Sequence, residues 1–345
     1  MSGPLLEARD LTIQYQTPQG LITAVSDASF IIEEGEYFGL VGESGCGKST
    51  IAQSIIGGLP DNGQIQSGEL LYSGEPIHGL SDEELNRKIR WKEISFIPQG
   101  SMNSLDPLEK VSDQAVEIAR SHGMSDKKEV IERLSELFEI VGLSEDRISE
   151  YPHQFSGGMQ QRAIIALSLL LDPSIIIADE PTTALDVIMQ DQIFKYLDEV
   201  RDVSNVSVLL ITHDISLIFE SCERLAIMHA GQIAETGKAT DIFENPRHPY
   251  TILLQEAFPD VRYPNRKLET IDGDPPQNFG NVDYCTFAER CPWAIEECRT
   301  HSPILQSING SEDHEASQHR AACFRKDEVY KDYESNQQIG QGHDD

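Results

Sequence analysis

Basic side chains are scarce in this chain. It carries 27 Lys plus Arg against 58 Asp plus Glu, which gives a formal net charge of -31 at pH 7. A surface of that sign repels nucleic acid, so we expect no nucleic-acid partner. The acids are scattered along the whole sequence, and concentrated salt screens the repulsion between them. We therefore predict a protein from a halophile, with an ordinary acidic cytosolic protein as the alternative.

Hydrophobic runs long enough to cross a membrane are also missing. No stretch of about 18 apolar residues occurs. The start, Met1 to Pro4, lacks the charged-then-apolar pattern of a secretory signal. We therefore expect the chain to stay in the cytoplasm. Its 345 residues, 39% of them apolar, are enough for one large domain and a smaller one.

The most informative segment is Gly-Glu-Ser-Gly-Cys-Gly-Lys-Ser-Thr at residues 42–50. It follows the apolar residues 37–41 and precedes a helical pattern over 51–56, the context in which G-x-x-x-x-G-K-[ST] forms a phosphate-binding loop. The pattern predicts a nucleoside triphosphate site with Lys48 near the β- and γ-phosphates and the Ser49 hydroxyl on Mg²⁺. Cys46 has no expected chemistry and is interpreted as a small filler. The remaining predicted nucleotide-binding residues of the loop are Gly42, Ser44, Gly45, Gly47 and Thr50.

Two acids follow a second apolar run, residues 174–178. A continuous β-branched run is typical of a strand buried on both faces of a parallel sheet. Ligands bind at the carboxyl ends of such strands. We predict that Asp179 holds Mg²⁺ and that Glu180 polarises the attacking water as general base. The alternative is an acid pair that caps a helix.

Ser156, Gly157 and Gly158 precede a helical run over 163–171. Such a helix start offers a hydroxyl and backbone N–H groups to an anion. The segment resembles the [LF]-S-G-G-[QM] signature of the ATP-binding cassette (ABC) ATPases. Together with the phosphate loop and the acid pair in the same order, the resemblance covers about the first 260 residues. It implies that ATP is the nucleotide.

The resemblance implies roles for further residues. Gln99 matches the Q-loop, which coordinates Mg²⁺ and senses the γ-phosphate, and residues 184–186 match the D-loop. His213 matches the switch histidine that donates to the γ-phosphate. Tyr15 lies where the family places an aromatic ring on adenine, with packing beside a strand as the alternative. Ser156 to Gly158 would contact the ATP of a second subunit.

The fold class expected is α/β, a P-loop NTPase core with an antiparallel β subdomain and a helical subdomain, plus a small Cys-rich C-terminal extension. Alternation over 5–15 and 20–32 predicts the antiparallel strands, and a Ser-x-x-Glu capping box starts a predicted helix over 81–89. The expected boundaries are 1–260 for the ATPase domain, with its helical part at about 100–165, and 261–325 for the extension. The polar, acidic residues 326–345 are predicted to be disordered.

Four of the six cysteines fall in the extension, at Cys285, Cys291, Cys298 and Cys323. Clustered cysteines in a cytoplasmic protein favour metal over disulfides. The C-x₂-C pairs usual for zinc are missing, and four thiolates suit a [4Fe–4S] cluster. Zinc, with nearby histidines as extra ligands, and free thiols or a disulfide remain open. Arg290-Cys291-Pro292 and Cys298-Arg299 resemble the C-terminal extension of oligopeptide/dipeptide importer ATPases, some of which carry an iron–sulfur cluster. The nearby histidines are His301, His314 and His319.

The resemblance implies an ATP-hydrolysing subunit that energises a membrane importer of dipeptides or oligopeptides, bound peripherally at the cytoplasmic face of the membrane. The implied partners are a second ATPase subunit, identical or paralogous, two membrane-spanning permease subunits and an extracytoplasmic substrate-binding protein. Residues 99–108 are a candidate groove for the permease. A sugar or nickel importer is the first alternative. A soluble ABC ATPase of DNA repair or of ribosomes is the rival, but the chain lacks the sustained heptads of a coiled coil and has one cassette.

Overall fold

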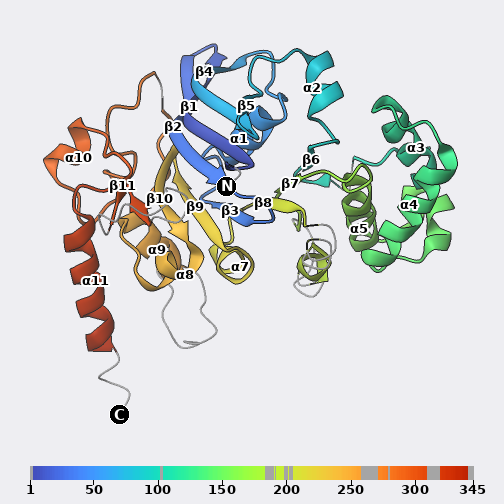
Figure 1. Ribbon diagram of the computed structural model, residues 1–345. Coiled ribbons are helices and arrows are strands. Elements are labelled where there is room, and N and C mark those ends of the chain that lie inside the picture. Colours follow the sequence, from blue (N-terminus) through green and yellow to red (C-terminus); the bar gives the residue numbers. More distant parts are fainter. Residues whose placement is uncertain are drawn as a thin grey trace. The chain divides into compact units, whose positions relative to one another are not determined.

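The computed structural model describes residues 3–101, 104–182, 190, 192–197, 201, 205–257, 271–278, 280–308 and 319–340. Five predicted features lie outside this part of the chain: the D-loop at 184–186, residues 102–103 of the candidate permease groove, His314, the boundary at 260 and the last five residues. The chain divides into two compact units, and Figure 1 labels their helices and strands. The first comprises residues 1–33, 38–78 and 212–345, and the second comprises residues 34–37 and 79–211.

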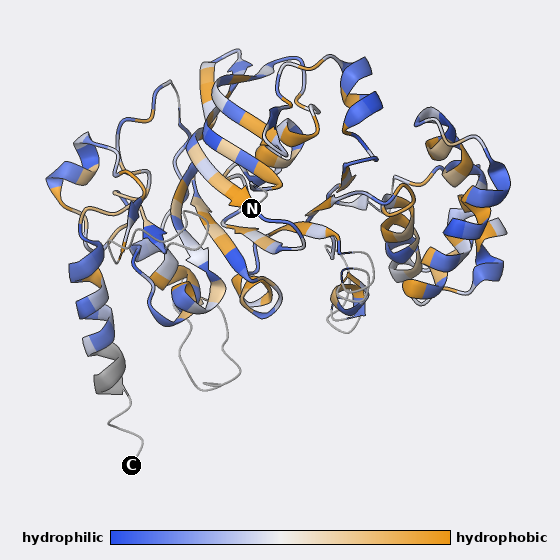
Figure 2. Cartoon of the chain, viewed as in Figure 1, coloured by the Kyte–Doolittle hydropathy of each residue, from blue (hydrophilic) through white to orange (hydrophobic). Residues whose placement is uncertain are grey.

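An antiparallel sheet in the first unit is the β subdomain predicted from alternation. Its strand order is β2-β1-β4-β5. Along β1 the buried side chains of Leu6, Ala8, Leu11 and Ile13 alternate with more exposed ones, and Figure 2 shows hydrophobic and hydrophilic residues interleaved in these strands. The strands are β1 (Leu6–Thr17), β2 (Gly20–Ile32), β4 (Gly63–Tyr72) and β5 (Glu75–Pro76).

A second group of strands in the first unit carries the phosphate loop. β3 (Tyr37–Val41) pairs in parallel with β9 (Arg224–His229), and β9 pairs antiparallel with β10 (Gln232–Lys238). Two strands of the predicted extension continue the row, because β12 (Arg320–Ala321) pairs with β10, and β11 (Gln306–Ser307) with β12. The described part of the extension therefore belongs to the same compact unit as the phosphate loop.

The helices of the first unit include one that was not expected. Residues 326–340 form α11, so the prediction of disorder is wrong for this stretch. Its first turns are anchored, since Val329 is buried, Tyr330 Oη donates to Asn245 at 2.7 Å, and the Arg247 guanidinium lies 3.9 Å from the centre of the Tyr330 ring. Composition alone does not reveal these contacts. The helices are α1 (Lys48–Ile55), α7 (Ile215–Ser221), α8 (Ala239–Glu244), α9 (Pro249–Ala257), α10 (Glu296–Thr300) and α11 (Lys326–Gly340).

The second unit contains the predicted parallel strands and the helical subdomain. β6 (Ile94–Ile97), β7 (Ile175–Asp179) and β8 (Ser207–Thr212) pair in parallel, with every residue of β7 buried. The capping box predicted at Ser81 and Glu84 is present at the start of α2. The helices are α2 (Asp82–Lys88), α3 (Val111–Ser121), α4 (Lys127–Ile140) and α5 (Gly157–Ser168), with short 3₁₀ turns at Glu145–Ser149 and Pro152–Gln154.

No helix within the described ranges is both long and apolar enough to span a membrane.

Candidate nucleotide site and cysteine pocket

The phosphate loop joins the fully buried strand β3 to helix α1. Gly47 caps the helix with φ 106°, a left-handed conformation that favours glycine. The buried Lys48 Nζ donates to the carbonyl oxygens of Gly42 at 2.8 Å and Glu43 at 2.9 Å. The loop therefore folds around its own lysine, with the N–H groups of the α1 start available to an anion.

Strand β9 and the turn after it support the loop from behind. A Cβ atom placed on Gly42 would lie 2.0 Å from the carbonyl oxygen of Met228, so only glycine fits. The N–H of Gly231 donates to the carbonyl of Cys46 at 2.9 Å. Cys46 is itself buried, and burial raises the pKa of its thiol. The cysteine thus fills space inside the loop, as the sequence interpretation had it.

Tyr15 lies beside the loop in the first unit. Its hydroxyl donates to Thr50 Oγ1 at 3.3 Å, and its ring lies against Gly63 of β4, where a Cβ would approach the ring to 2.6 Å. Ser49 and Thr50 are partly exposed at the start of α1, whereas Ser44 and Gly45 are exposed on the loop. Stacking of Tyr15 on adenine stays a prediction, and the contact with Thr50 places the ring next to the nucleotide-binding segment.

The acid pair and the Q-loop glutamine meet in the second unit. Asp179 is buried at the carboxyl end of β7, and Glu180 follows with φ 47°, a left-handed conformation rare for a residue with a side chain. Gln99, after β6, donates from Nε2 to Glu180 Oε2 at 2.6 Å. Two residues later, Ser101 Oγ donates to Oε1 of the buried Gln161 on α5 at 2.8 Å. The Q-loop therefore contacts both the acid pair and the signature helix.

The signature segment caps α5 as predicted. Ser156 is the N-cap, and its hydroxyl accepts from the N–H of Met159 at 3.4 Å. Ser156 and Gly157 are exposed, whereas Gly158 is buried. An exposed helix start with a hydroxyl and no Cβ at the next residue suits an anion that approaches from outside. His213 is also exposed, in the bend after β8.

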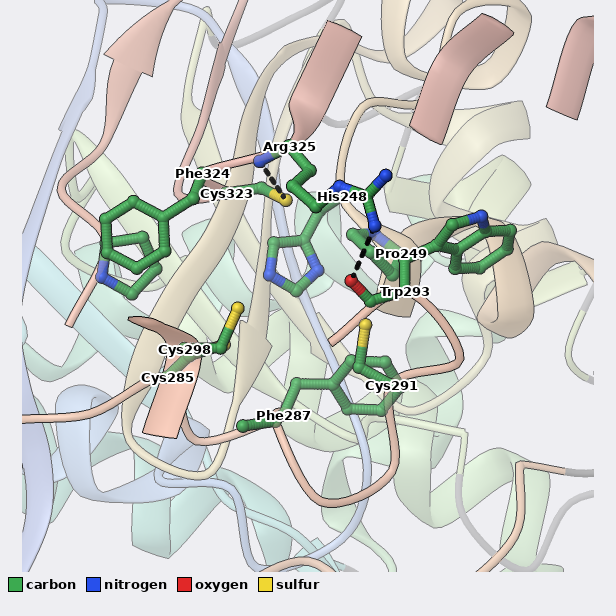
Figure 3. Close-up of a pocket in the computed structure, with 12 residues that line it drawn as sticks. His248, Pro249, Cys285, Phe287, Cys291, Trp293, Cys298, Cys323, Phe324 and Arg325 are labelled. Atoms are coloured by element: carbon green, nitrogen blue, oxygen red, sulfur yellow. Dashed lines mark hydrogen bonds between the residues drawn. The ribbon is translucent and has the colours of Figure 1, made fainter. Parts of the chain in front are cut away.

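The four cysteines of the extension line one pocket of the first unit. Cys285, Cys291, Cys298 and Cys323 surround it together with His248 and Phe287 (Figure 3). The part of the chain that the structure describes contains no group of three or more His, Cys, Asp or Glu side chains arranged to hold a metal ion. The four cysteines therefore share one pocket. The described residues provide no ligand set for a single metal ion.

Burial controls the chemistry of these thiols. It raises the pKa of Cys285 to about 11 and the pKa of Cys291 and of Cys323 to about 12, and neighbouring cysteines raise them further by mutual repulsion of thiolates. The N–H of Arg325 donates to Cys323 Sγ at 3.4 Å. At neutral pH the thiols of Cys285, Cys291 and Cys323 are therefore protonated, and a metal that binds them must release their protons.

A network that the sequence analysis missed connects the extension to the phosphate loop. Arg290 of the extension binds Glu43 of the loop, His229 at the end of β9 touches Arg290, and Tyr250 of α9 accepts a hydrogen bond from the Glu43 N–H. An acid inside a phosphate-binding loop was the one available signal, since such a residue needs a nearby cation.

Comparison with known proteins extends this picture. Residues 25–183 match the family model described as ABC transporter, and residues 234–298 match the one described as oligopeptide/dipeptide transporter, C-terminal region. The oligopeptide transport ATP-binding protein OppD of Escherichia coli is 41% identical over 308 residues, 89% of this chain and 91% of that protein. The dipeptide transport ATP-binding protein DppD of Bacillus subtilis is 41% identical over 297 residues, 85% of this chain and 88% of that protein. The chain belongs to the family of oligopeptide and dipeptide ABC transporter ATP-binding proteins.

Solved structures agree on the ATPase fold. A dimeric ATP-binding cassette in a post-hydrolysis state, bound to ADP and Pi, is 29% identical and superposes with a TM-score of 0.58, covering 68% of this chain and 98% of that one. The cbiO1 protein of Clostridium perfringens, part of the cbiONQ complex, is 25% identical, with a TM-score of 0.60 over 73% of this chain and 94% of that one. As an ABC ATPase, this chain binds and hydrolyses ATP and works with membrane permeases and a second ATPase subunit.

Proposed function

We propose that this ABC ATPase energises the import of dipeptides or oligopeptides from the cytoplasmic face of the membrane, where it binds two permease subunits served by an extracytoplasmic substrate-binding protein. The observation that carries the proposal is the identity of about 40% to peptide transport ATP-binding proteins over almost the whole chain. That similarity includes the extension as well as the ATPase segment. Sugar and nickel importers share the ATPase chemistry and are outcomes of the transport assay below.

The residues of the site have assigned roles in this proposal. Lys48 and the loop N–H groups bind the β- and γ-phosphates, and Tyr15 stacks on adenine. Glu180 accepts the proton of the water whose oxygen attacks the γ-phosphorus, while the bond to the ADP oxygen breaks. The hydrogen bond from Gln99 orients the Glu180 carboxylate, and the left-handed backbone at Glu180 fits a position held for function rather than for stability. His213 donates to the γ-phosphate.

Mg²⁺ fits the donors that the chain offers. The Ser49 hydroxyl, the buried Asp179 carboxylate and the Gln99 amide oxygen are all hard oxygen ligands, the type that Mg²⁺ prefers. When bound, the ion neutralises charge that builds up on the phosphate oxygens. Asp179, at the end of β7, and Gln99, two residues after the neighbouring strand β6, would hold the ion.

The signature segment acts on a second subunit. Because Ser156 and Gly157 are exposed at the start of α5, they bind the γ-phosphate held by the phosphate loop of the partner ATPase. The Ser101–Gln161 hydrogen bond joins this helix to the Q-loop. When two ATPase subunits close around ATP, a movement of the helix is therefore passed on to residues 99–108, the proposed permease groove.

The test uses the ATPase co-purified with its permeases and reconstituted in vesicles. Glu180→Gln keeps ATP binding but slows hydrolysis by about 10²- to 10⁴-fold, the usual effect of losing a general base. Glu139→Gln, on the exposed face of α4, is the matched control and keeps the parent rate. Uptake of labelled peptides by the parent, and not by Glu180→Gln, supports the proposal. Uptake of nickel or sugar instead of peptides would contradict the substrate class.

We also propose that the cysteine pocket holds a [4Fe–4S] cluster. A cluster of this kind takes four thiolates, and four cysteines line the pocket. The N–H of Arg325 on Cys323 supplies the kind of hydrogen bond that stabilises a cluster sulfur ligand. The four cysteines lie far from Asp179 and Glu180 in the sequence. The cluster would therefore have a structural or regulatory role rather than a catalytic one.

Anaerobic purification tests the cluster directly. The protein absorbs broadly near roughly 400 nm and contains about four irons per chain. Cys291→Ser loses both, whereas Cys222→Ser, a buried cysteine outside the pocket, retains both. Stoichiometric zinc without iron would replace the cluster by a zinc module, and the absence of both metals would leave four free thiols.

A further inference from the structure

The phosphate loop carries an acid of its own. Glu43 stands between Gly42 and Ser44, inside the segment that wraps the phosphates of ATP. A carboxylate at this place repels the phosphates, and the formal net charge of -31 gives little background compensation. The loop therefore needs a dedicated cation close to Glu43.

Arg290 is that cation, and it comes from the extension. Its Nη1 donates to Glu43 Oε2 and its Nη2 to Glu43 Oε1, both at 2.7 Å. This is the bidentate geometry in which an arginine fixes the direction as well as the charge of a carboxylate. The Arg290 side chain is 6% exposed and that of Glu43 25% exposed, so solvent screens the pair far less than a surface ion pair.

The guanidinium is held from its other sides too. Nε donates to the carbonyl of Asp272 at 2.9 Å, and Nη1 lies 3.2 Å from His229 Nε2. Arginine can only donate, so Nε2 accepts and the proton of His229 is on Nδ1, which donates to Thr286 Oγ1 at 3.0 Å. Arg290 is thus fixed between β9 and the extension before any nucleotide arrives.

The backbone of the loop has a second attachment to the same region. The N–H of Glu43 donates to the hydroxyl of Tyr250 at 3.0 Å. The Tyr250 ring packs against His229 at 4.7 Å and Phe287 at 5.3 Å between ring centres. Phe287 is a wall of the cysteine pocket. The side chain and the backbone of Glu43 are therefore hydrogen-bonded to Arg290 and Tyr250, and Tyr250 contacts the pocket residue Phe287.

Sequence adjacency completes the connection. Arg290 directly precedes Cys291, one of the four pocket cysteines, and its N–H donates to the carbonyl of Phe287 at 3.0 Å. A change in the backbone at Cys291 therefore moves Arg290. A movement of Glu43 in turn displaces Arg290 and with it the backbone at Cys291. The two sites are linked through one partly buried, bidentate ion pair.

We propose that Arg290 is a positioning residue that neutralises Glu43 and fastens the phosphate loop to the extension, so that nucleotide binding and the packing of the cysteine pocket are coupled. The proposal rests on the proposed role of residues 42–50 as the ATP site. Coupling of this kind is reciprocal: if the pocket affects ATP affinity, ATP affects the pocket by the same factor.

The first test measures the dissociation constant of MgATP for the purified chain. Arg290→Gln leaves the Glu43 carboxylate without its cation, and affinity falls on the order of tenfold. The double variant Glu43→Gln with Arg290→Gln removes the repulsion and returns to within about threefold of the parent. The loss of MgATP affinity in Arg290→Gln becomes smaller in high salt, because the repulsion between Glu43 and the phosphates is electrostatic. Arg299→Gln is the control, since its ion pair with Glu289 is 45% and 82% exposed and such pairs contribute little.

The second test follows amide hydrogen exchange of residues 285–300 with and without saturating Mg²⁺ and a non-hydrolysable ATP analogue. Exchange slows on binding in the parent and in Arg299→Gln but not in Arg290→Gln. If Arg290→Gln does not fold, both tests use Arg290→Lys instead. Its affinity for MgATP is lower than that of the parent by about threefold, because lysine cannot make the second hydrogen bond to Glu43. Parent-like affinity and parent-like slowing in the folded arginine variant would overturn the inference. A parent chain that does not bind MgATP would refute the ATP site itself, which is a different result.

Discussion

Replacing Gly42 by alanine tests whether close packing behind the phosphate loop sets its position. The added Cβ would meet the carbonyl oxygen of Met228 at 2.0 Å and Cys46 Sγ at 2.9 Å. The first partner is backbone of β9, which is paired with β3 and β10 and cannot rotate away as a side chain would.

The size of the effect follows from this distance. A tolerable carbon–oxygen contact is about 3.3 Å, so loop and strand must separate by about 1.3 Å. A misplacement of about 1 Å in a site that binds and orients a reacting group lowers the rate roughly 100-fold. We expect Gly42→Ala to fold, with a lower melting temperature, and to lose about two orders of magnitude in kcat/KM for ATP.

Gly45→Ala is the matched control in the same loop. Gly45, unlike Gly42, has a left-handed backbone, φ 79°, and a Cβ there would meet nothing within 4 Å. Only the conformational penalty of about 1–2 kcal/mol remains, which corresponds to a loss of roughly 5- to 30-fold. Phosphate release and calorimetric ATP binding are measured for both variants. If Gly42→Ala were as active as Gly45→Ala, the packing argument would be refuted.

Three further predictions concern the signature, the buried histidine and the surface charge. Gly157→Asp aims a carboxylate at the γ-phosphate of the partner subunit, so ATP binding persists but ATP-driven dimers vanish in a Glu180→Gln background, as light scattering will show. Burial lowers the pKa of His248 from 6.5 to about 4, so the unfolded chain takes up its proton first. The free energy of unfolding then declines by up to about 3 kcal/mol as the pH falls from 6.5 to about 4. Urea titrations of the parent and of His248→Gln measure how the free energy of unfolding changes with pH. Identical pH dependence in the two proteins would exclude His248 as the cause. The melting temperature rises between dilute buffer and molar KCl because salt screens the acidic surface, and an unchanged value would refute the halophile interpretation.

Local patterns were enough for the ATPase elements. The phosphate loop, the buried strand before Asp179 and the capping box at Ser81 each depend on neighbours within a few positions, and each lies where it was predicted. The antiparallel subdomain followed in the same way from alternation over β1 and β2.

Contacts between distant segments were not predictable from one sequence. The Gln99–Glu180 hydrogen bond spans 81 positions, and the Arg290–Glu43 pair spans 247. Residues 326–340 looked disordered because their composition is polar, but Val329 and Tyr330 find partners that no local pattern reveals. The cysteines were recognised by spacing, whereas the pocket that collects them requires the folded chain.

The pairing of β12 with β10 has a consequence for synthesis of the chain. Glu235 on β10 is fully buried, and its carboxylate accepts from the N–H groups of Arg247 and His248 and from His319 Nε2, just before β12. A nascent chain that has completed the ATPase motifs still lacks His319 and presents an uncovered strand edge, a template for association with other chains. Ribosome-bound chains that end before residue 319 therefore expose this edge, and addition of the last segment covers it.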